Sequence, residues 1–586
     1  MCSITVSAPK TLTDCRRFFL EPQNTKHRHY EALRAFYVEQ RPSKEVAADF
    51  GFTPGSFRVL CHEFRRTPDP AFFVEAKPGP RAQPKKSAAR EQIIAMRKNN
   101  LSVYEISDAL IRKGTPLSPT AVREVLKEEG FAPLPRRRDD ERPDGRILPT
   151  KAPVADVRQL DLSQRRFRTR FGGLFLFVPW LVQAQFDRIM QCAELPGTKM
   201  VPAGHAMRSL LALKLFGSGR NSRVMSDVFD QGLALFAGLN APPKRSFLTE
   251  YSCRIDPCCY PKLMSLWFDA ASQLGLGRGE SFDLDFHTIP FHGNDALVEK
   301  HYVSRRSRRQ KGVLAFLAQD DGQRTFCYAN AELRKEEQND EILRFVEFWQ
   351  DRTGQLPNEL VFDSKLTTYA NLNRLNELGI SFITLRRRTR KILERLHELP
   401  RSAWRRIELE NVTRAYRTPR VLDERVTLTG YEGPLRQLAV AELGHDEPTL
   451  LLTNQLRRSP RKLIGRYARR MLIENGIADG VDFFHMDALS SAVPLKINCD
   501  LQLTLMASAL YRLLGAKVGN GYQTAKSRRI FHDFIEATAQ VTLEGRDIIV
   551  RFQKRAHNPM LVDAGFAETN VAVPWLGHRH LRFVFG

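Results

Sequence analysis

Long apolar segments are missing from this sequence. The longest apolar run, residues 171–182, is interrupted by two glycines and a proline. It is shorter than the roughly 18 residues that a membrane-spanning helix needs. The first residues lack the continuous apolar core of a secretory signal. We therefore expect neither a transmembrane helix nor a secretory leader.

Paired cysteines are also missing. The chain has nine cysteines, but none of them forms a Cys-x-x-Cys pair or a zinc-binding spacing, and Cys258 and Cys259 are adjacent. The pattern indicates neither a disulfide framework nor a zinc-binding domain. Reduced, mainly structural thiols in a cytoplasmic protein are the simplest interpretation.

Positive charge, by contrast, is in excess. Over 586 residues, 90 lysines and arginines face 66 acidic residues, which gives a formal net charge of +24. This excess predicts a polyanionic partner, with nucleic acid as the first candidate and an anionic membrane surface as the alternative. The chain is too long for one core, and we expect roughly three to five domains.

Residues 1–72 contain the signals of three short helices with a tight turn before the last. Thr53 is placed to cap the third helix, and Pro54 occupies its first position. This order predicts an all-α helix-turn-helix unit. Its candidate DNA-binding residues are Arg58, Arg65 and Arg66.

The same plan repeats in residues 87–135. Ser102 and Glu105 have the spacing of a capping box, and Ser118 with Pro119 begins a further helix that carries Arg123. A single three-helix unit is often a packing module, but two in tandem favour DNA binding. Arg123 is the DNA-binding candidate of this second unit.

Two linkers and a helical segment follow from the composition. Residues 73–86 are rich in proline and glycine, and Lys77 and Arg81 suit phosphates or a narrow minor groove, although a solvated linker is an equal alternative. Residues 136–158 form a second linker. Residues 159–280 read as a helical domain without a catalytic arrangement.

Two acids lie on one predicted strand that begins at Ser281. Phe282, Leu284 and Phe286 alternate with Asp283 and Asp285, so both carboxylates point to the same face. Buried carboxylates on one face are costly unless something positive holds them, and a divalent metal ion would do so. Asp285 is the preferred ligand, and Asp283 is the alternative.

A third acid follows a second buried strand. The apolar residues 360–362 run directly into Asp363, and a helical pattern and another apolar strand come after it. An acid at the carboxyl end of a buried strand lies where open α/β sheets bind their ligands. Taken alone, Asp363 would more simply be an N-cap or turn aspartate, and it is the surrounding pattern that favours a site residue.

The order of these elements predicts an α/β ribonuclease H-like core. That core needs a further acid on a later helix, and the nearest candidates are Glu394 and Glu398. However, residues 406–452 are rich in strand patterns and look like an insertion. We therefore expect the core to comprise residues 281–390 and 456–520, with a β-rich insertion at 391–455 and a C-terminal region at 521–586.

A strongly helical segment after the insertion carries a recognisable pattern. Tyr467, Arg470 and Glu474 lie at i, i+3 and i+7, on one face of a helix. This spacing, together with the stretches around Asp285 and Asp363, resembles bacterial insertion-sequence DDE transposases with the Tyr-Arg-Glu-Lys (YREK) signature. The lysine of that signature is absent, because its place falls on Val481.

The resemblance implies a function and a set of roles. Asp285, Asp363 and Glu474 would be the catalytic residues and the ligands of two Mg²⁺ ions, which Mn²⁺ could replace. Tyr467 and Arg470 would be accessory residues. The expected partners are double-stranded DNA, as the element's terminal inverted repeats and the target, and a second copy of the chain on paired ends.

The activity implied is cleavage of the element's ends by metal-assisted hydrolysis, followed by joining of the 3′-hydroxyl ends to target DNA. We would then expect a cytoplasmic, nucleoid-associated enzyme. Two alternatives stay open: a catalytically idle DNA-binding regulator derived from a transposase, and a nuclease without strand transfer.

Overall fold

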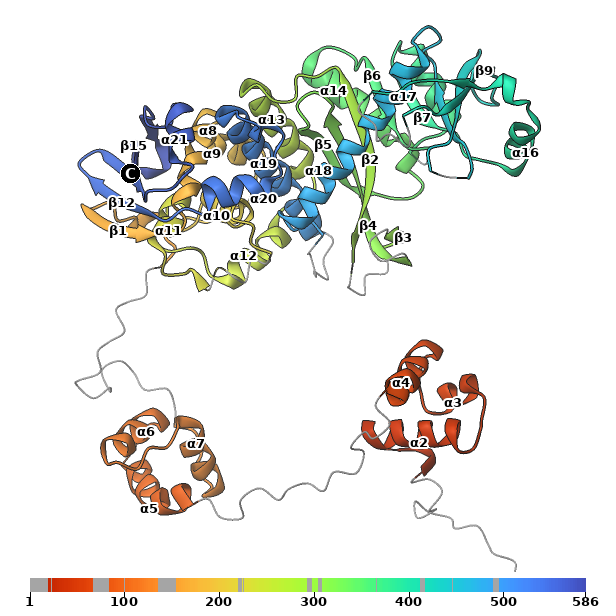
Figure 1. Ribbon diagram of the computed structural model, residues 1–586. Coiled ribbons are helices and arrows are strands. Elements are labelled where there is room, and N and C mark those ends of the chain that lie inside the picture. Colours follow the sequence, from red (N-terminus) through yellow and green to blue (C-terminus); the bar gives the residue numbers. More distant parts are fainter. Residues whose placement is uncertain are drawn as a thin grey trace, which may run out of the picture. The chain divides into compact units, whose positions relative to one another are not determined.

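The computed structural model describes most of the chain between residues 19 and 586. It does not describe residues 1–18, 23, 67–83, 100, 135–153, 220–223, 225, 292–297, 304–307, 365, 411–416, 445 and 488–494. The chain divides into two compact units, Met1–Ile147 and Leu148–Gly586, and each is considered by itself (Figure 1). The protein is thus multidomain, with helical and mixed-sheet regions.

The first unit contains two separate three-helix cores. The first core is built from α2 (Thr25–Tyr37), α3 (Ser43–Asp49) and α4 (Pro54–Arg66) around buried residues such as Phe57 and Leu33. In the second, α5 (Pro84–Lys98), α6 (Val103–Arg112) and α7 (Pro119–Glu128) enclose Ile93, Ile106 and Val122. The capping box of Ser102 and Glu105 is confirmed at the start of α6.

A five-stranded sheet joins the beginning and the end of the second unit. Its order is β1-β12-β13-β15-β14. These strands are β1 (Arg165–Thr169), β12 (Ala539–Glu544), β13 (Asp547–Phe552), β15 (Arg579–Phe585) and β14 (Val571–Val573). Its inner face packs in one large hydrophobic core with residues from both the helical segment and the C-terminal region.

Helices contribute the rest of this hydrophobic core. They are η3 (Gly172–Phe177), α8 (Val178–Gln183), α9 (Phe186–Cys192), α10 (Ala203–Leu215), α11 (Gln231–Ala237), α12 (Arg245–Tyr251), α13 (Cys259–Gln273), α19 (Leu495–Val518), α20 (Ser527–Ile530) and α21 (Asn558–Asp563). Residues 159–280 are mainly helical, as expected, but they also supply the edge strand β1. The C-terminal region completes the core of this segment.

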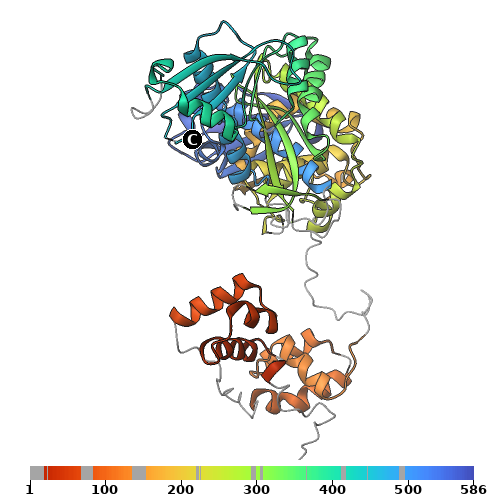
Figure 2. The same cartoon turned by 90° about the vertical axis from the view of Figure 1, so that its right-hand side faces the viewer.

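A larger mixed sheet forms the other half of the second unit (Figure 2). Its central strands run in the order β5-β4-β2-β6-β7. They are β5 (Phe326–Leu333), β4 (Arg308–Asp320), β2 (Ser281–Pro290), β6 (Glu359–Phe362) and β7 (Ser381–Leu385). Strand β4 is antiparallel to both of its neighbours, whereas β2, β6 and β7 are parallel.

The strand-rich segment after β7 extends the same sheet. β11 (Thr449–Thr453) pairs antiparallel with β7. Then come β10 (Leu435–Ala441), β9 (Arg420–Val426) and the short β8 (Arg405–Arg406), and β3 (Lys300–Val303) pairs with β4 at the opposite edge. α16 (Arg390–Glu398) precedes these strands. The segment is therefore continuous with the central strands rather than a separate sheet.

Helices lie on both faces of the central strands. On one face, α14 (Glu341–Thr353) and α15 (Tyr369–Glu377) pack against Phe282 and Leu284 of β2. On the other, α17 (Pro460–Arg469) and α18 (Met471–Asp482) form a nearly continuous helix that passes in front of β2 in Figure 1. Ile473 of α18 packs there with Ile289 of β2.

Candidate active site

Asp285 lies in the middle of β2, on the face covered by α18. Its Oδ1 accepts a hydrogen bond of 2.8 Å from the backbone N–H of Phe286. Its Oδ2 lies 3.3 Å from Nη1 of Arg470. Because 22% of the Asp285 side chain is exposed, solvent still reaches this carboxylate.

Arg470 links Asp285 to Glu474. The guanidinium Nη2 of Arg470 donates to Glu474 Oε1 at 2.9 Å, while its Nη1 faces Asp285. The Arg470 side chain is only 10% exposed, but that of Glu474 is 47% exposed. Glu474 therefore has one side held by Arg470 and the other open to solvent.

Asp363 is the first residue after β6, the strand that pairs with β2. Its Oδ1 accepts a hydrogen bond of 2.5 Å from the backbone N–H of Ser364. Its negative charge contributes to raising the pKa of Asp285. The charges of Asp363 and Glu474 thus both act on Asp285. We call these three residues the carboxylate site.

Burial is the main cause that raises the pKa of Asp285, to about 6. The charge of Arg470 and the Phe286 N–H lower it, but the charges of Glu474 and Asp363 raise it further. Because burial is the largest of these causes, the raised pKa reflects the cost of ionising a largely buried carboxylate, a cost that a nearby cation offsets. A group of carboxylates in this condition favours an additional cation.

Tyr467 lies beside Arg470, whose guanidinium is 5.6 Å from the centre of the tyrosine ring. Burial raises the pKa of Tyr467 to about 12, although the charge of Arg470 opposes this effect. Its hydroxyl is therefore protonated at neutral pH and can act as a hydrogen-bond donor. All five residues predicted for the catalytic and accessory roles thus lie close together.

The donor set of the carboxylate site suits a hard divalent ion, because carboxylate oxygens are the ligands that Mg²⁺ prefers. The arrangement of these carboxylates in the structure, however, does not suit such an ion. Within the described part of the chain, no three His, Cys, Asp or Glu side chains are grouped so that they could hold a metal ion. Arg470 instead lies between two of the carboxylates, so binding of a metal would require Glu474 to leave Arg470.

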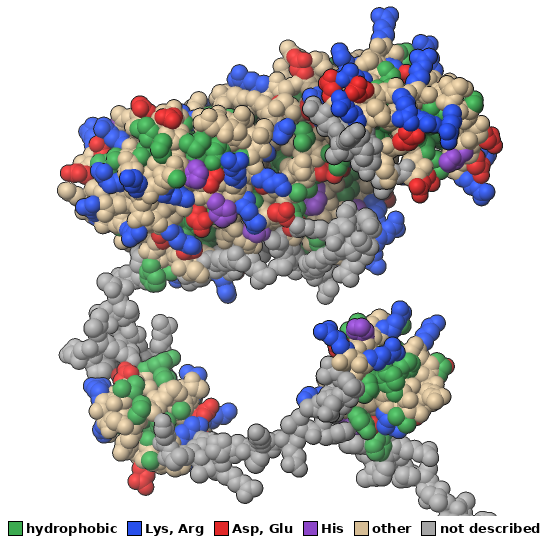
Figure 3. All heavy atoms as spheres, in the orientation of Figure 1, with side chains coloured by type: hydrophobic (Ala, Val, Ile, Leu, Met, Phe, Trp, Pro, Cys, Tyr) green, Lys and Arg blue, Asp and Glu red, His purple; other side chains and the backbone are tan. Residues whose placement is uncertain are grey.

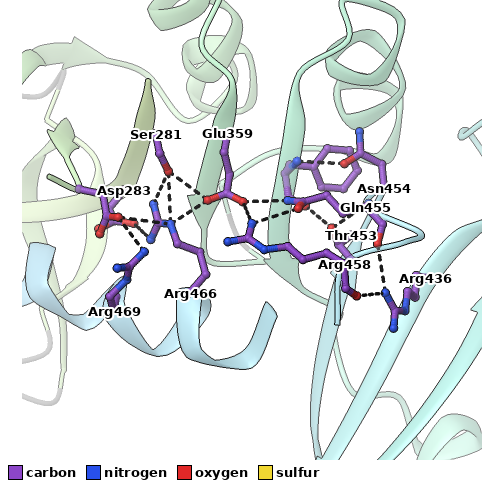
Figure 4. Close-up of polar contacts among 12 residues, drawn as sticks. Ser281, Asp283, Glu359, Arg436, Thr453, Asn454, Gln455, Arg458, Arg466 and Arg469 are labelled. Carbon is purple, nitrogen blue, oxygen red and sulfur yellow. Dashed lines mark hydrogen bonds and ion pairs between the residues drawn. The ribbon is translucent and has the colours of Figure 1, made fainter. Parts of the chain in front are cut away.

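A second group of charged residues lies beside the carboxylate site (Figure 4). It is one turn earlier along the helix and two residues earlier along β2. Arg466 of α17 donates from Nη1 to Asp283 Oδ1 at 2.7 Å and from Nε to Glu359 Oε1 at 2.8 Å. Its Nη2 donates to the Ser281 hydroxyl at 2.9 Å. We call Ser281, Asp283, Glu359 and Arg466 the buried cluster, since the side chains of Arg466 and Asp283 are at most 1% exposed.

The buried cluster continues toward the added strands. Gln455 donates to Glu359 at 2.8 Å, and Arg458 also contacts Glu359 (Figure 4). Arg436 of β10 donates to the backbone carbonyl of Arg458. These contacts connect α17, β2, β6 and the segment after β11 through one polar network.

The buried cluster separates the two aspartates that the sequence places on one face. Asp283 is fully buried and already paired with Arg466, whereas Asp285 is partly open to solvent. This favours Asp285 over Asp283 as a ligand. Sequence reasoning did not identify Arg466. Its position could have been a signal, because the four residues from Arg466 to Arg470 along a helix cover about the same length as the two residues from Asp283 to Asp285 along a strand.

The alternative acid Glu394 lies apart from these groups. It is on α16, where its carboxylate accepts a bond of 2.7 Å from Arg390 and is 54% exposed. Val481, which takes the place of the signature lysine, is buried on α18 beside Ile473 and Ile477. It thus contributes to packing.

The predicted DNA-binding residues of the first unit are placed in part. Arg58 on α4 and Arg123 on α7 are both exposed, each at the fifth residue of its helix. Arg66 is also exposed, while Arg65 donates to the Tyr37 hydroxyl at 2.9 Å. Lys77 and Arg81 lie outside the described residues.

The chain has a distant likeness among solved structures. It is similar to piggyBac transposase in a synaptic complex with hairpin DNA, with a TM-score of 0.35 and 13% identity over 63% of this chain and 82% of that one. No family model matches the chain, and no curated protein does. Among the described residues, no helix has the length and apolar character to cross a membrane.

Proposed function

We propose that the chain is a DDE-type DNA transposase with a ribonuclease H-like core. The observation that carries the proposal is the carboxylate site itself. Asp285 lies on β2, Asp363 directly follows the neighbouring parallel strand β6, and Glu474 comes from the helix that covers them. Three acids from two strands and one helix are what the sequence pattern implies for this enzyme class.

The strand arrangement supports the proposed core. The predicted succession is three strands, a helix, a strand, a helix and a strand; the chain adds the short β3 to it, and the central strands lie in the order β5-β4-β2-β6-β7 with β4 antiparallel to its neighbours. In that order β2 is central, so Asp285 lies beside the end of β6, where Asp363 begins the following turn. The pairing of β2 with β6 therefore brings Asp285 and Asp363, which are far apart in sequence, to one site.

The chemistry follows from the donor set. Asp285, Asp363 and Glu474 would hold Mg²⁺, and an ion bound there would supply Lewis-acid activation of the attacking oxygen and charge neutralisation of the leaving oxygen of a phosphodiester. Arg470 would hold Glu474 until the site is loaded and afterwards contact a phosphate. The Tyr467 hydroxyl, protonated because its pKa is raised to about 12, would donate to a phosphate oxygen beside the cleaved bond.

The first unit would recognise the ends of the element. In a helix-turn-helix unit, the beginning of the third helix contacts base edges in the major groove. Arg58 and Arg123 occupy equivalent exposed positions near the beginning of α4 and α7. Arg66 would contact phosphates, and the net charge of +24 would add affinity that depends steeply on salt.

A strand-transfer assay separates this proposal from its two alternatives. Labelled, pre-cut end DNA is incubated with target DNA, protein and Mg²⁺. A transposase joins the 3′-hydroxyl end to the target. A nuclease cuts uncut ends but yields no joined product, and a regulator binds the DNA and leaves it intact.

The division of roles is tested with a fragment of residues 1–135, which contains both three-helix cores. It should prefer the element's terminal sequence to random DNA, and Arg58→Ala or Arg123→Ala should reduce that preference. Equal affinity for both DNAs would contradict the recognition role of the first unit.

A further inference from the structure

The five-stranded sheet at the C-terminal end of the second unit has one uncovered face. Alternate residues of β12, such as Val541 and Leu543, point into the hydrophobic core, while Gln540 and Thr542 point outward. The described helices with the most extensive contacts to this sheet are η3, α8, α11 and α21, and the outward-pointing Arg166, Arg168, Arg551 and Arg582 are exposed. The outer face is therefore available to a partner.

Arginines are concentrated on that outer face. The strand register places Arg168, Gln540, Arg551 and Val584 in one row across β1, β12, β13 and β15. The next row contains Arg166, Thr542, Ile549 and Arg582. We call these two rows the arginine face, and no acidic residue belongs to either row.

The arginines of this face are largely free to bind an anion. Arg168 and Arg551 are exposed and make no ion pair with any described residue. Arg166 donates to Gln540, and Arg582 lies 3.6 Å from Asp547 in the adjoining row. In the space-filling view, Lys and Arg side chains occur over the end of the unit formed by β1 and β12, with some acidic side chains among them (Figure 3).

The spacing of the arginines suits a phosphate backbone. Neighbouring strands are about 4.8 Å apart and alternate residues about 7 Å apart, so the four arginines span roughly 7 by 14 Å. Duplex DNA carries one charge per about 1.7 Å of its axis, so several phosphates would face this area. Gln540 and Thr542 lie between the arginines and supply further phosphate donors.

We propose that the arginine face binds the phosphate backbone of duplex DNA and forms a second DNA contact, separate from the three-helix cores. This inference rests on the proposed function. It assigns a role to the C-terminal region, for which the sequence indicated none beyond packing or dimer contacts.

Two other partners fit the face less well. A membrane surface needs exposed apolar side chains that enter the lipid, but the apolar members of the face, Ile549 and Val584, are partly buried. A second copy of the chain would bring the same arginines together across a symmetric interface, and like charges repel there. Duplex DNA satisfies both the charge and the polar character.

The test measures how the affinity of the full-length protein for random-sequence duplex DNA depends on salt. Each lost phosphate contact lowers the slope of log K against log salt by about 0.9. The Arg168→Ala/Arg551→Ala variant should therefore lose about 1.8 from the slope. Since both side chains are exposed, its melting temperature should be unchanged.

The matched control is Arg188→Ala/Arg254→Ala, which removes the same charge from exposed arginines elsewhere in the second unit. It should keep the wild-type slope. An unchanged slope in the Arg168/Arg551 variant, or an equal loss in both variants, would overturn the inference.

Two further comparisons complete the test. If the Arg168/Arg551 substitutions abolish binding to phosphatidylserine vesicles but leave the DNA slope unchanged, the face binds membranes and the inference fails. The proposed enzymatic function is judged separately, by the strand-transfer assay. A protein without strand transfer whose slope falls as expected would refute that function and retain this DNA contact.

Discussion

Two groups of acids and an arginine lie side by side on β2 and the helix that covers it, yet they differ in access to solvent. In the buried cluster, Arg466 and Asp283 are at most 1% exposed. In the carboxylate site, Asp285 is 22% and Glu474 47% exposed. The same chemical groups therefore serve packing in one place and remain available to a ligand in the other.

The comparison shows how one helix can carry both roles. Arg466, Arg470 and Glu474 recur every four residues and so lie along one side of α17 and α18, facing β2. Arg466 fixes the helix against β2 and β6. Arg470 and Glu474 come later on the same side of the helix, where the carboxylate site is open to solvent. The buried cluster thus positions the carboxylate site.

The largest expected effect is on catalysis at the carboxylate site. Asp363→Asn and Glu474→Gln should each lower the rate of DNA cleavage on the order of 10³-fold or more, equivalent to about 4 kcal/mol, because each removes a metal ligand. Circular dichroism and end binding should stay close to wild type. Cleavage of a labelled end fragment measures the effect.

Glu394→Gln is the matched control for Glu474→Gln, because its carboxylate is exposed on α16 and bonded only to a neighbouring arginine among the described residues. It should cleave at the wild-type rate. An inactive Glu394→Gln together with an active Glu474→Gln would mean that the third acid lies on α16.

The next effect concerns stability and should be larger in the buried cluster. Arg466→Ala leaves the buried carboxylate of Asp283 without its ion-pair partner and Glu359 with Arg458 alone, which should lower the free energy of unfolding by about 3–5 kcal/mol. Arg470→Ala affects the carboxylates of Asp285 and Glu474, which solvent reaches, and should therefore cost less than Arg466→Ala. Urea unfolding of both variants tests the contrast, and equal losses would contradict it.

Binding of a metal ion at the carboxylate site should stabilise the folded protein. At about ten times its dissociation constant, an ion that binds only the folded state adds about 1.4 kcal/mol. Mg²⁺ should therefore raise the melting temperature of the wild type and of Asp283→Asn. The same rise in Glu474→Gln would show that the ion binds elsewhere.

The smallest effect is a pH dependence within the buried cluster. Burial alone would raise the pKa of Glu359, but the Gln455 hydrogen bond and the charges of Arg466 and Arg458 lower it below its usual 4.5. A lowered pKa stabilises the fold above pH 4.5, and this contribution is lost as the pH falls through the folded-state value.

Glu359→Gln should consequently lower the melting temperature at pH 7, and the difference from wild type should shrink below about pH 4.5. Melting curves from pH 7 down to about pH 3, which pass through the unfolded-state pKa of about 4.3, measure this difference. A constant difference over that range would exclude a role for the Glu359 charge.

Much of the site could be predicted from local patterns. Strand alternation placed Asp283 and Asp285 on one face, and helical spacing placed Tyr467, Arg470 and Glu474 together. The sequence preferred Asp285, but the structural reason is the pairing of Asp283 with Arg466, which spans 183 residues of sequence. No local pattern shows which of two equivalent acids a distant helix will cover.

The fold was predictable where neighbouring elements pack on each other. The two three-helix cores and the capping box at Ser102 are local and were predicted. The pairing of β1 with β12 was not, because Arg166 and Gln540 lie 374 residues apart. The continuation of the central strands into β11 likewise depends on pairing between distant segments.

The comparison of Asp285→Asn with Asp283→Asn tests the central claim most directly. Both substitutions remove one carboxylate from the same face of β2, and metal-dependent cleavage of a labelled end fragment is measured for each. The account predicts that Asp285→Asn is inactive and that Asp283→Asn retains substantial activity. An active Asp285→Asn beside an inactive Asp283→Asn would contradict it.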